Sequence, residues 1–173
     1  MRQLMINFSE LKKLTPHEHQ RGCFGKCETS PINKQLILYT DGKAIYTQFQ
    51  PLERHIGWGT ILHGGILTTI MDEILGWEAV LLAKMVCVTK KIEVQFHHPA
   101  QFDDSYTITA KYLKHTQSEI IVEGEVHNSG NILIMSATGV FSPLPAQAID
   151  KLGIMPPEQL QLVLEYIKSI EKA

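Results

Sequence analysis

The hydrophobic pattern places short alternating stretches on either side of one long apolar stretch. Apolar and polar residues alternate over 35–40 and 43–50, which predicts two β-strands. Asp41-Gly42 separates them and indicates a hairpin, because both central residues of such a tight turn adopt positive φ. Residues 51–65 hold four glycines and are predicted to form a loop.

The long apolar stretch from Ile66 to Met85 predicts a helix that is apolar nearly all round. Its length is enough to span a membrane. However, Asp72, Glu73 and Glu78 lie inside it, and each carboxylate would be costly in lipid. We therefore expect a helix buried in the protein interior.

The rest of the chain is predicted to form mainly strands, with a helix at each end. An amphipathic helix over 4–14 ends at Thr15-Pro16, because proline disfavours a helical residue before it. A second helix over 156–171 carries one apolar stripe. The four strands expected between the long helix and the last helix cover 86–96, 105–114, 119–127 and 131–141.

This order of elements predicts an α+β protein in which a curled antiparallel β-sheet wraps around the long central helix. Several strands that follow one helix must fold back over that helix to bury its apolar surface. This layout is the hot-dog fold. We expect a single domain over 1–173 with its core at about 20–143. The N-terminal helix lies within 1–19, and 144–173 forms a helical tail.

Composition and charge exclude several classes of partner. The formal net charge is -2, which gives no bias toward nucleic acid or an anionic membrane surface. The first thirteen residues mix charges with apolar residues and do not read as a signal peptide, so a cytoplasmic protein is expected. Cys23 and Cys27 stand near His17 and His19, and a zinc site is the alternative to two free thiols in a loop. We expect free thiols and no metal.

Three segments together resemble a known enzyme family. His63-Gly64-Gly65 is followed by Asp72-Glu73 in the apolar helix, the stretch Thr89 to Pro99 reads as a strand that ends in proline, and Cys23-Phe24-Gly25 stands upstream. These segments resemble the hot-dog acyl-CoA thioesterases of the phenylacetate-pathway type. The resemblance implies hydrolysis of an acyl-CoA by a homodimer or homotetramer, with no cofactor. Some members carry an asparagine about six residues before the histidine, where this sequence has Gly57 and Trp58.

The chemistry of thioester hydrolysis fits these residues. Gly64 and Gly65 stand at a helix N-terminus, where backbone N–H groups without internal partners can stabilise an oxyanion. Asp72 follows Gly65 by nearly two turns and returns to the same helix face, as a general base or a nucleophile. Glu73 points about 100° away from Asp72. We expect it to lie near the substrate or to pair with a cation.

The remaining site residues follow from the resemblance. Thr89 aligns with a hydroxyl residue that helps hold the attacking water, the alternative being an ordinary strand residue. His63 is expected to shape the loop and the oxyanion donors rather than to act as a base. Residues expected to contact substrate, with surface or core roles as alternatives, are Lys90, Lys91 and Arg54 at coenzyme A phosphates and Trp58 and Trp77 at the acyl group.

Two other functions remain open. A hot-dog dehydratase or hydratase would use a histidine, but the His-Gly-Gly junction speaks against it. A non-catalytic acyl-CoA-binding module is the other alternative, and an intact Asp72 argues against it. The sequence holds no phosphate-binding G-x-G-x-x-G or P-loop motif and no G-x-S-x-G nucleophile elbow. His97-His98 are neighbours on a strand and face opposite ways, so they are not expected to bind one metal.

Overall fold

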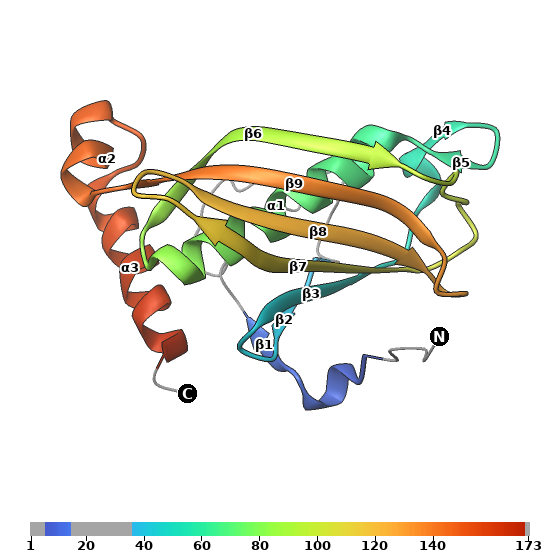
Figure 1. The fold of residues 1–173 in the computed structure, drawn as a ribbon, viewed down its shortest axis with the longest axis horizontal. Helices are drawn as coiled ribbons and strands as arrows, with labels where there is room; N and C mark the ends of the chain where they lie inside the picture. Colours follow the sequence, from blue (N-terminus) through green and yellow to red (C-terminus); the bar gives the residue numbers. More distant parts are fainter. Residues whose placement is uncertain (1–5, 15–35, 172–173) are drawn as a thin grey trace.

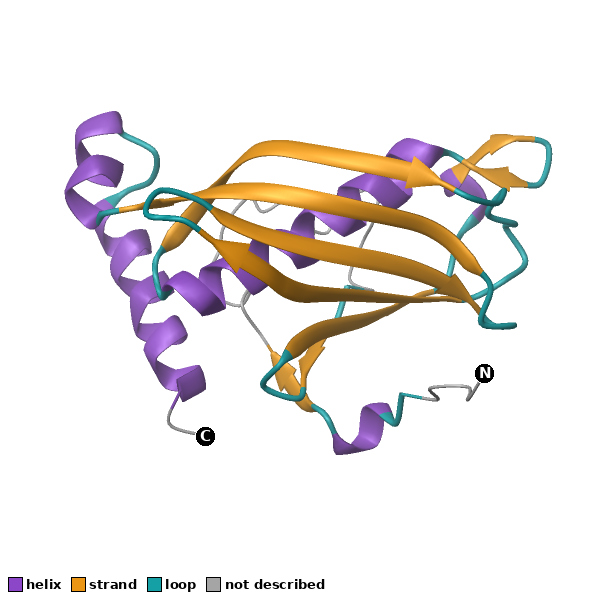
Figure 2. Ribbon diagram, viewed as in Figure 1, coloured by secondary structure: helices purple, strands orange, loops and turns teal. Residues whose placement is uncertain are grey.

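A computed structural model describes residues 6–14 and 36–171 of the chain (Figure 1). The expectations for Cys23, Cys27, His17, His19 and the Thr15-Pro16 boundary lie outside these residues. In the described part, strands form a curved sheet that lies along one long helix, with two shorter helices at one end (Figure 2).

The main sheet has seven strands in the order β1-β2-β3-β7-β8-β9-β6, and each neighbouring pair is antiparallel. The central helix α1 is Gly64–Ala83. This arrangement confirms the predicted α+β hot-dog fold. The strands are β1 Lys12–Leu14, β2 Leu38–Thr40, β3 Ala44–Phe49, β6 Val86–Phe96, β7 Tyr106–His115, β8 Ile120–Asn128 and β9 Leu133–Leu144.

Helix α1 lies close against the sheet because glycines face it. Ile70, Met71, Ile74 and Leu75 are fully buried. A Cβ atom at Gly124 in β8 would lie 3.1 Å from one δ-methyl of Leu75, and one at Gly139 in β9 would lie 3.2 Å from the other. The missing side chains therefore let the helix pack near the strands, and this packing forms the core.

The predicted N-terminal helix over 4–14 is wrong for the residues that the structure describes. Phe8–Glu10 forms one turn of 3₁₀-helix, and Lys12–Leu14 is strand β1, which pairs with β2. Leu14 is buried in the core through this pairing. Tertiary contacts override weak local helix propensity in so short a segment.

The segment 51–65 is not the simple loop that its glycines predicted. Glu53–His55 forms a 3₁₀ turn, and β4 Ile56–Trp58 pairs with β5 Ile61–Leu62 in a two-stranded sheet. Gly59 between them has a φ of +56°, a conformation that favours glycine. Glycines here permit a tight hairpin rather than irregular chain.

The β2–β3 turn is confirmed, but its geometry differs from the expected one. Only Gly42 has a positive φ, of 84°. Asp41 instead uses its side chain, and its Oδ1 accepts the N–H groups of Lys43 and Ala44 at 2.9 and 3.0 Å. A carboxylate that bonds the following backbone stabilises the turn without left-handed geometry at its own position.

The predicted C-terminal helix over 156–171 is confirmed, and a shorter helix that was not predicted precedes it. α2 is Ala146–Leu152 and α3 is Pro157–Glu171, and Gly153 with a φ of 62° ends the first of them. The apolar stripe of α3 packs on the molecule, and the ring of Tyr166 meets that of Trp77 in α1 edge-on with centroids 6.1 Å apart. Among the described helices, none has the length and apolarity needed to cross a membrane.

Glu78 is a buried acid in the second half of α1, only 5% exposed. Burial raises the pKa of its carboxyl to about 7, and the Asp41 charge adds to this rise. The backbone N–H of Tyr112 opposes the rise by bonding the carboxylate. Tyr112 lies at a bulge of β7 against β8, where regular pairing is interrupted.

Glu78 is expected to make stability fall as pH rises. Its pKa is above the ordinary 4.5 when folded, so the unfolded chain releases this proton first. The free energy of unfolding that Glu78 contributes is fully present below about pH 4.5. It falls by on the order of 3 kcal/mol as pH rises to about 7. Glu78→Gln should therefore match the wild type near pH 4 and exceed it near pH 9 in urea unfolding.

Glu158→Gln in the exposed first turn of α3 is the matched control for this experiment. The free energy of unfolding of this variant should change between acid and alkaline pH by the same amount as that of the wild type. An identical pH dependence in wild type and Glu78→Gln would contradict the assignment of this effect to Glu78.

Candidate active site

The start of α1 is anchored by a buried histidine that precedes it. The His63 N–H donates to the His55 carbonyl at 2.9 Å. His55 is fully buried, and its Nδ1 accepts the Leu52 N–H at 3.0 Å. These bonds fix the chain just before the Gly-Gly pair. Sequence reasoning did not select His55, because no motif marks it.

His63 caps the helix with its ring. Its Nδ1 accepts the Gly65 N–H at 3.0 Å, and its carbonyl accepts the Ile66 N–H at 2.9 Å. The Gly64 N–H has no acceptor among the residues that the structure describes. The first turn of α1 therefore presents one open donor at Gly64, while the donor at Gly65 is engaged by His63.

Close contacts explain why glycines occupy both positions. A Cβ at Gly64 would lie 3.0 Å from Cζ of Phe96, and a Cβ at Gly65 would lie 3.0 Å from the His63 ring. Phe96 ends strand β6 and is 48% exposed, so its ring covers part of the helix start. Other side chains here would displace one ring or the other.

Asp72 and Thr89 meet between α1 and β6. The Thr89 hydroxyl donates to Asp72 Oδ1 at 3.0 Å. Asp72 is half-buried in the third turn of α1, and Thr89 is exposed on the edge strand. The two residues are seventeen positions apart in the sequence. The structure brings them together, as expected for two residues of one site.

A β-bulge directs Thr89 toward the helix. Ile92 and Val94 face the core, opposite Gly139 and Ala137 of β9, so Glu93 and Gln95 face outward. Continued alternation would place Thr89 outward as well. The register shifts between Thr89 and Lys91, which sets Thr89 opposite the buried Phe141. Bulges near active sites commonly re-aim a side chain in this way.

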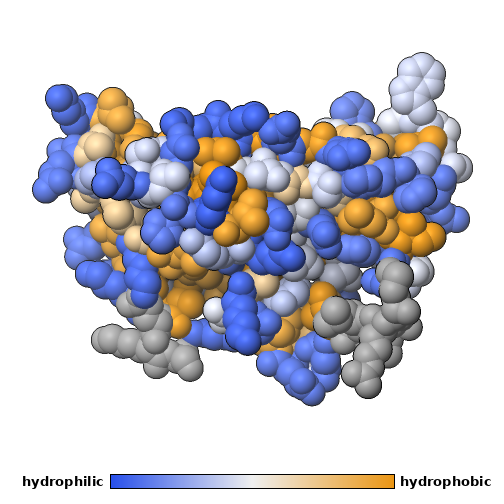
Figure 3. All heavy atoms as spheres, viewed as in Figure 1, coloured by the Kyte–Doolittle hydropathy of each residue, from blue (hydrophilic) through white to orange (hydrophobic). Residues whose placement is uncertain are grey.

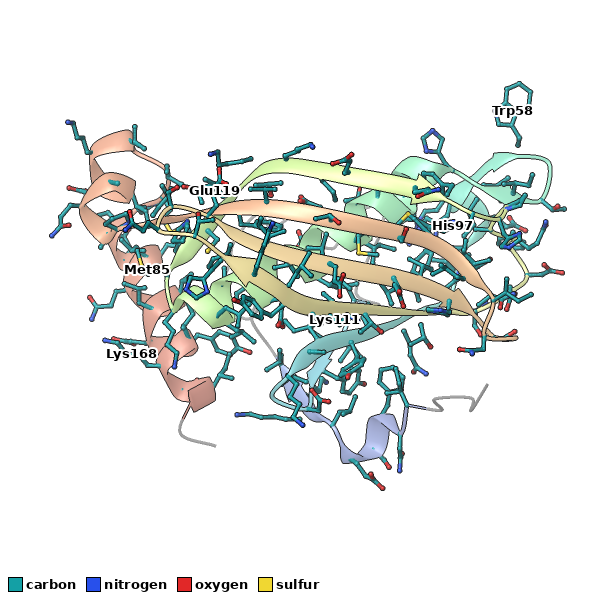
Figure 4. All side chains as sticks on the ribbon, viewed as in Figure 1. Trp58, Met85, His97, Lys111, Glu119 and Lys168 are labelled. Carbon is teal, nitrogen blue, oxygen red and sulfur yellow. The ribbon has the colours of Figure 1, made fainter. Side chains whose placement is uncertain are left out.

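The other predicted contact residues lie apart from this pair. Lys90 forms an ion pair with Glu119, and Lys91 with Glu93 at 2.6 Å. Trp58 is 87% exposed at the β4–β5 hairpin and points away from the molecule (Figure 4). The other tryptophan, Trp77, is buried in the core. Glu73 is half-buried on α1, and Arg54 is exposed in the 3₁₀ turn.

A pocket of about 400 Å³ opens beside Gly64. Its walls are mainly apolar and come from β5, α1 and the end of β6. Ile61, Leu67 and Phe96 contribute, and His97 and His98 stand at its margin. His97 also bonds Ser136 Oγ through Nε2 at 2.8 Å. The pocket has the size and polarity of a small-molecule site next to the open N–H of Gly64.

Candidate metal ligands are not grouped in this part of the chain. Over residues 6–14 and 36–171, no three His, Cys, Asp or Glu side chains are arranged to hold a metal ion. Cys87 in β6 is half-buried, and burial raises the pKa of its thiol to about 12.

Two groups of residues therefore form the candidate site, separated along the helix. Gly65 and Asp72 are seven residues apart, which corresponds to about 10 Å of rise in an α-helix. The donors of the first turn and the Asp72–Thr89 pair cannot contact one substrate carbonyl within a single chain, because reacting atoms must approach to about 3–3.5 Å.

The family comparison matches residues 59–135 to the thioesterase superfamily. This segment contains the helix start, Asp72 and Thr89. A search of curated proteins finds no sequence match.

Solved structures with the same fold include proteins described as hypothetical or putative thioesterases. A hypothetical thioesterase from Streptococcus pneumoniae TIGR4 with coenzyme A is 18% identical, with a TM-score of 0.56 over 59% of this chain and 79% of that chain. The protein smu.793 from Streptococcus mutans UA159, bound to acetyl CoA, is 16% identical, with a TM-score of 0.56 over 59% and 82%.

The E. coli PaaI protein of the phenylacetic acid degradation operon is 16% identical, with a TM-score of 0.56 over 62% of this chain and 76% of that chain. At these identities the structures show a common fold. The matched segment 59–135 and this fold confirm the resemblance of the chain to the hot-dog thioesterase superfamily.

Proposed function

We propose that this protein is a cytoplasmic acyl-CoA thioesterase that hydrolyses a thioester to a free acid and coenzyme A. The observation that carries the proposal is the hydrogen bond between Thr89 and Asp72 across α1 and β6. A half-buried carboxylate oriented by a hydroxyl is suited to activate water. The reaction needs no metal or organic cofactor, since the chain supplies both the base and the oxyanion donors.

Thr89 orients Asp72 in this mechanism. Its proton is directed to Oδ1, which leaves Oδ2 of the carboxylate to accept a proton from the attacking water. The lone pairs of the Thr89 oxygen can accept a hydrogen bond from the same water. Direct attack by Asp72 on the carbonyl, with a mixed anhydride as intermediate, is the alternative course.

The start of α1 stabilises the oxyanion. The Gly64 N–H is open, and the Gly65 N–H can be shared between His63 Nδ1 and the developing negative charge. The positive end of the helix dipole adds to this stabilisation. His63 therefore holds the donors in place and is not required as a base.

The site is completed by a second copy of the chain. β6 lies at one edge of the described sheet and pairs only with β9 there, so its outer edge has unpaired backbone groups. A two-fold axis at this edge pairs two β6 strands antiparallel and runs the two α1 helices in opposite directions. Asp72 of each chain then faces the helix start of the other. A tetramer would be two such dimers.

Substrate contacts divide between the pocket and the surface. The apolar pocket beside Gly64 is suited to an acyl group. Lys90 and Lys91 offer positive charge for coenzyme A phosphates, although each is paired with a glutamate. Glu73, half-buried on α1, completes the set of proposed contact residues. The neighbours bound to coenzyme A and acetyl CoA support a ligand of this class.

The test is release of free thiol from acyl-CoAs of several chain lengths and from an aromatic acyl-CoA. Turnover with at least one of them is the expected result. Hydration or dehydration of an acyl-CoA without thiol release would assign the protein to the hydratases. Saturable acyl-CoA binding without any turnover would make it a binding module, and either result would overturn the proposed function.

Thr89→Ala is expected to lower turnover by about 10-fold with little change in KM, because the hydroxyl orients the base and water rather than the substrate. Thr89→Ser keeps the hydroxyl and should retain most of the turnover. Steady-state kinetics of thiol release measure both values. A change confined to KM would instead indicate substrate binding, and no change at all would leave Thr89 as an ordinary strand residue.

A further inference from the structure

Trp58 is an unusually exposed aromatic residue. The segment of β4 and β5 projects at one corner of the molecule (Figure 3). Trp58 in this hairpin is 87% exposed and stands clear of the ribbon (Figure 4). Gly59 beside it has a φ of +56°, which fixes the turn that presents the ring. Tryptophans exposed at such a tip are typical anchors of protein interfaces, where they fill a pocket on the partner.

A largely apolar groove lies at the other end of the molecule. It lies between α2 and α3, and its volume is about 490 Å³. An apolar cavity of about 150 Å³ already accepts benzene, so this groove has room for an indole ring. Met155, Pro157, Leu160 and Leu164 supply apolar surface, and the carboxylates of Asp150 and Glu165 stand at its border.

The β4–β5 hairpin and the helices α2 and α3, which line the groove, lie at opposite ends of β6 (Figure 1). At the beginning of β6, Val86 pairs with Leu144 of β9, and α2 starts two residues later. The hairpin adjoins the chain just beyond the end of β6, since the Phe102 N–H donates to the Thr60 carbonyl at 2.8 Å and the Leu62 N–H to that of Ala100 at 2.9 Å.

We propose that Trp58 of each subunit inserts into the α2–α3 groove of the other subunit. Antiparallel pairing of two β6 strands places the end of one strand beside the beginning of the next, and so places each hairpin at the partner's groove. This inference rests on the proposed two-fold dimer. The indole N–H, which needs an acceptor once buried, meets the carboxylates of Asp150 and Glu165 there.

The contact would link the C-terminal helices to catalysis in the partner. α2 and α3 lie outside the segment matched by the family comparison, and the hairpin directly precedes the capping residue His63. A groove that holds the hairpin also holds the start of the partner's α1. The occupant of the α2–α3 groove is thus the β4–β5 hairpin of a second copy of this chain.

Tryptophan fluorescence provides the test, because Trp58 is exposed in the single chain and Trp77 is only 7% exposed. The emission of wild type minus that of Trp58→Phe isolates Trp58. In the dimer this emission should be shielded from iodide, and Leu164→Asp in the groove should remove the shielding. Leu162→Asp, on the same helix but outside the groove, should leave it unchanged.

Sedimentation gives a second measurement. Trp58→Ala should weaken dimerisation by about 10-fold or more, as expected when an interface anchor is lost. A wild-type dimer in which iodide quenches Trp58 as freely as an exposed indole refutes the inference. Shielding of Trp58 from iodide that appears only when lipid vesicles are added refutes it too, because the ring would then bind a membrane surface. A wild type that stays monomeric refutes both this contact and the shared site.

Thiol release measured on the same samples separates this inference from the proposed function. A dimer that hydrolyses acyl-CoA with an exposed Trp58 refutes only the docking of Trp58. A dimer with a shielded Trp58 that hydrolyses no acyl-CoA refutes only the thioesterase function and supports the docking.

Discussion

Asp72→Asn is expected to reduce turnover by at least about 100-fold while the fold is retained, since general base catalysis contributes this much or more. The substitution keeps the shape of the side chain, and the amide oxygen can still accept the hydrogen bond from Thr89. What is lost is the negative charge that takes a proton from water or attacks the carbonyl. Thiol release and thermal unfolding of the purified variant measure the two properties separately.

Glu73→Gln is the matched control, because it makes the same chemical change at the next residue of the same helix. Neighbours on a helix diverge by about 100°, so only one of the two carboxylates faces Thr89. We expect a much smaller loss for Glu73→Gln. If Asp72→Asn retained more than about a tenth of wild-type turnover, or if the two variants ranked in reverse, the role of Asp72 would be refuted.

Elements with strong local patterns could be predicted from the sequence. α1 begins and ends within two residues of the predicted helix, because its apolar run is long and its start is marked by the glycine pair. The four later strands follow from alternation. By contrast, β1 has only three residues and exists through its pairing with β2, which a local pattern does not contain.

The candidate site was predictable in its residue types but less so in its contacts. The His-Gly-Gly motif and the acid in the helix selected Gly64, Gly65 and Asp72. The meeting of Thr89 with Asp72 depends on a bulge, and simple alternation would have turned Thr89 outward. The engagement of the Gly65 N–H by His63 is a rotamer choice that no spacing rule reveals.

Mixed dimers of two inactive variants are expected to recover activity, and this follows from the distance along α1. Gly65 and Asp72 of one chain are about 10 Å apart, too far to act on one carbonyl. Two antiparallel helices bring Asp72 of each chain to the helix start of the other. A dimer then contains two equivalent sites, and each site takes its base from one chain and its donors from the other.

The two variants are Asp72→Asn and Gly65→Pro, and the second removes the Gly65 N–H in a first helical turn that tolerates proline. Gly65→Ala is its control, since it keeps the N–H and its methyl group only shifts the His63 ring, 3.0 Å away. Each pure variant should be inactive, and Gly65→Ala should retain more activity than Gly65→Pro.

In a mixed dimer, one site receives both substitutions and the other site receives neither. Random exchange of equal amounts makes half of all dimers mixed, each with one intact site of two, so activity should return to about a quarter of the wild-type value. A site contained within one chain would receive one substitution in every copy and stay inactive. Proof of subunit exchange by native mass spectrometry without recovered activity would therefore refute the shared site.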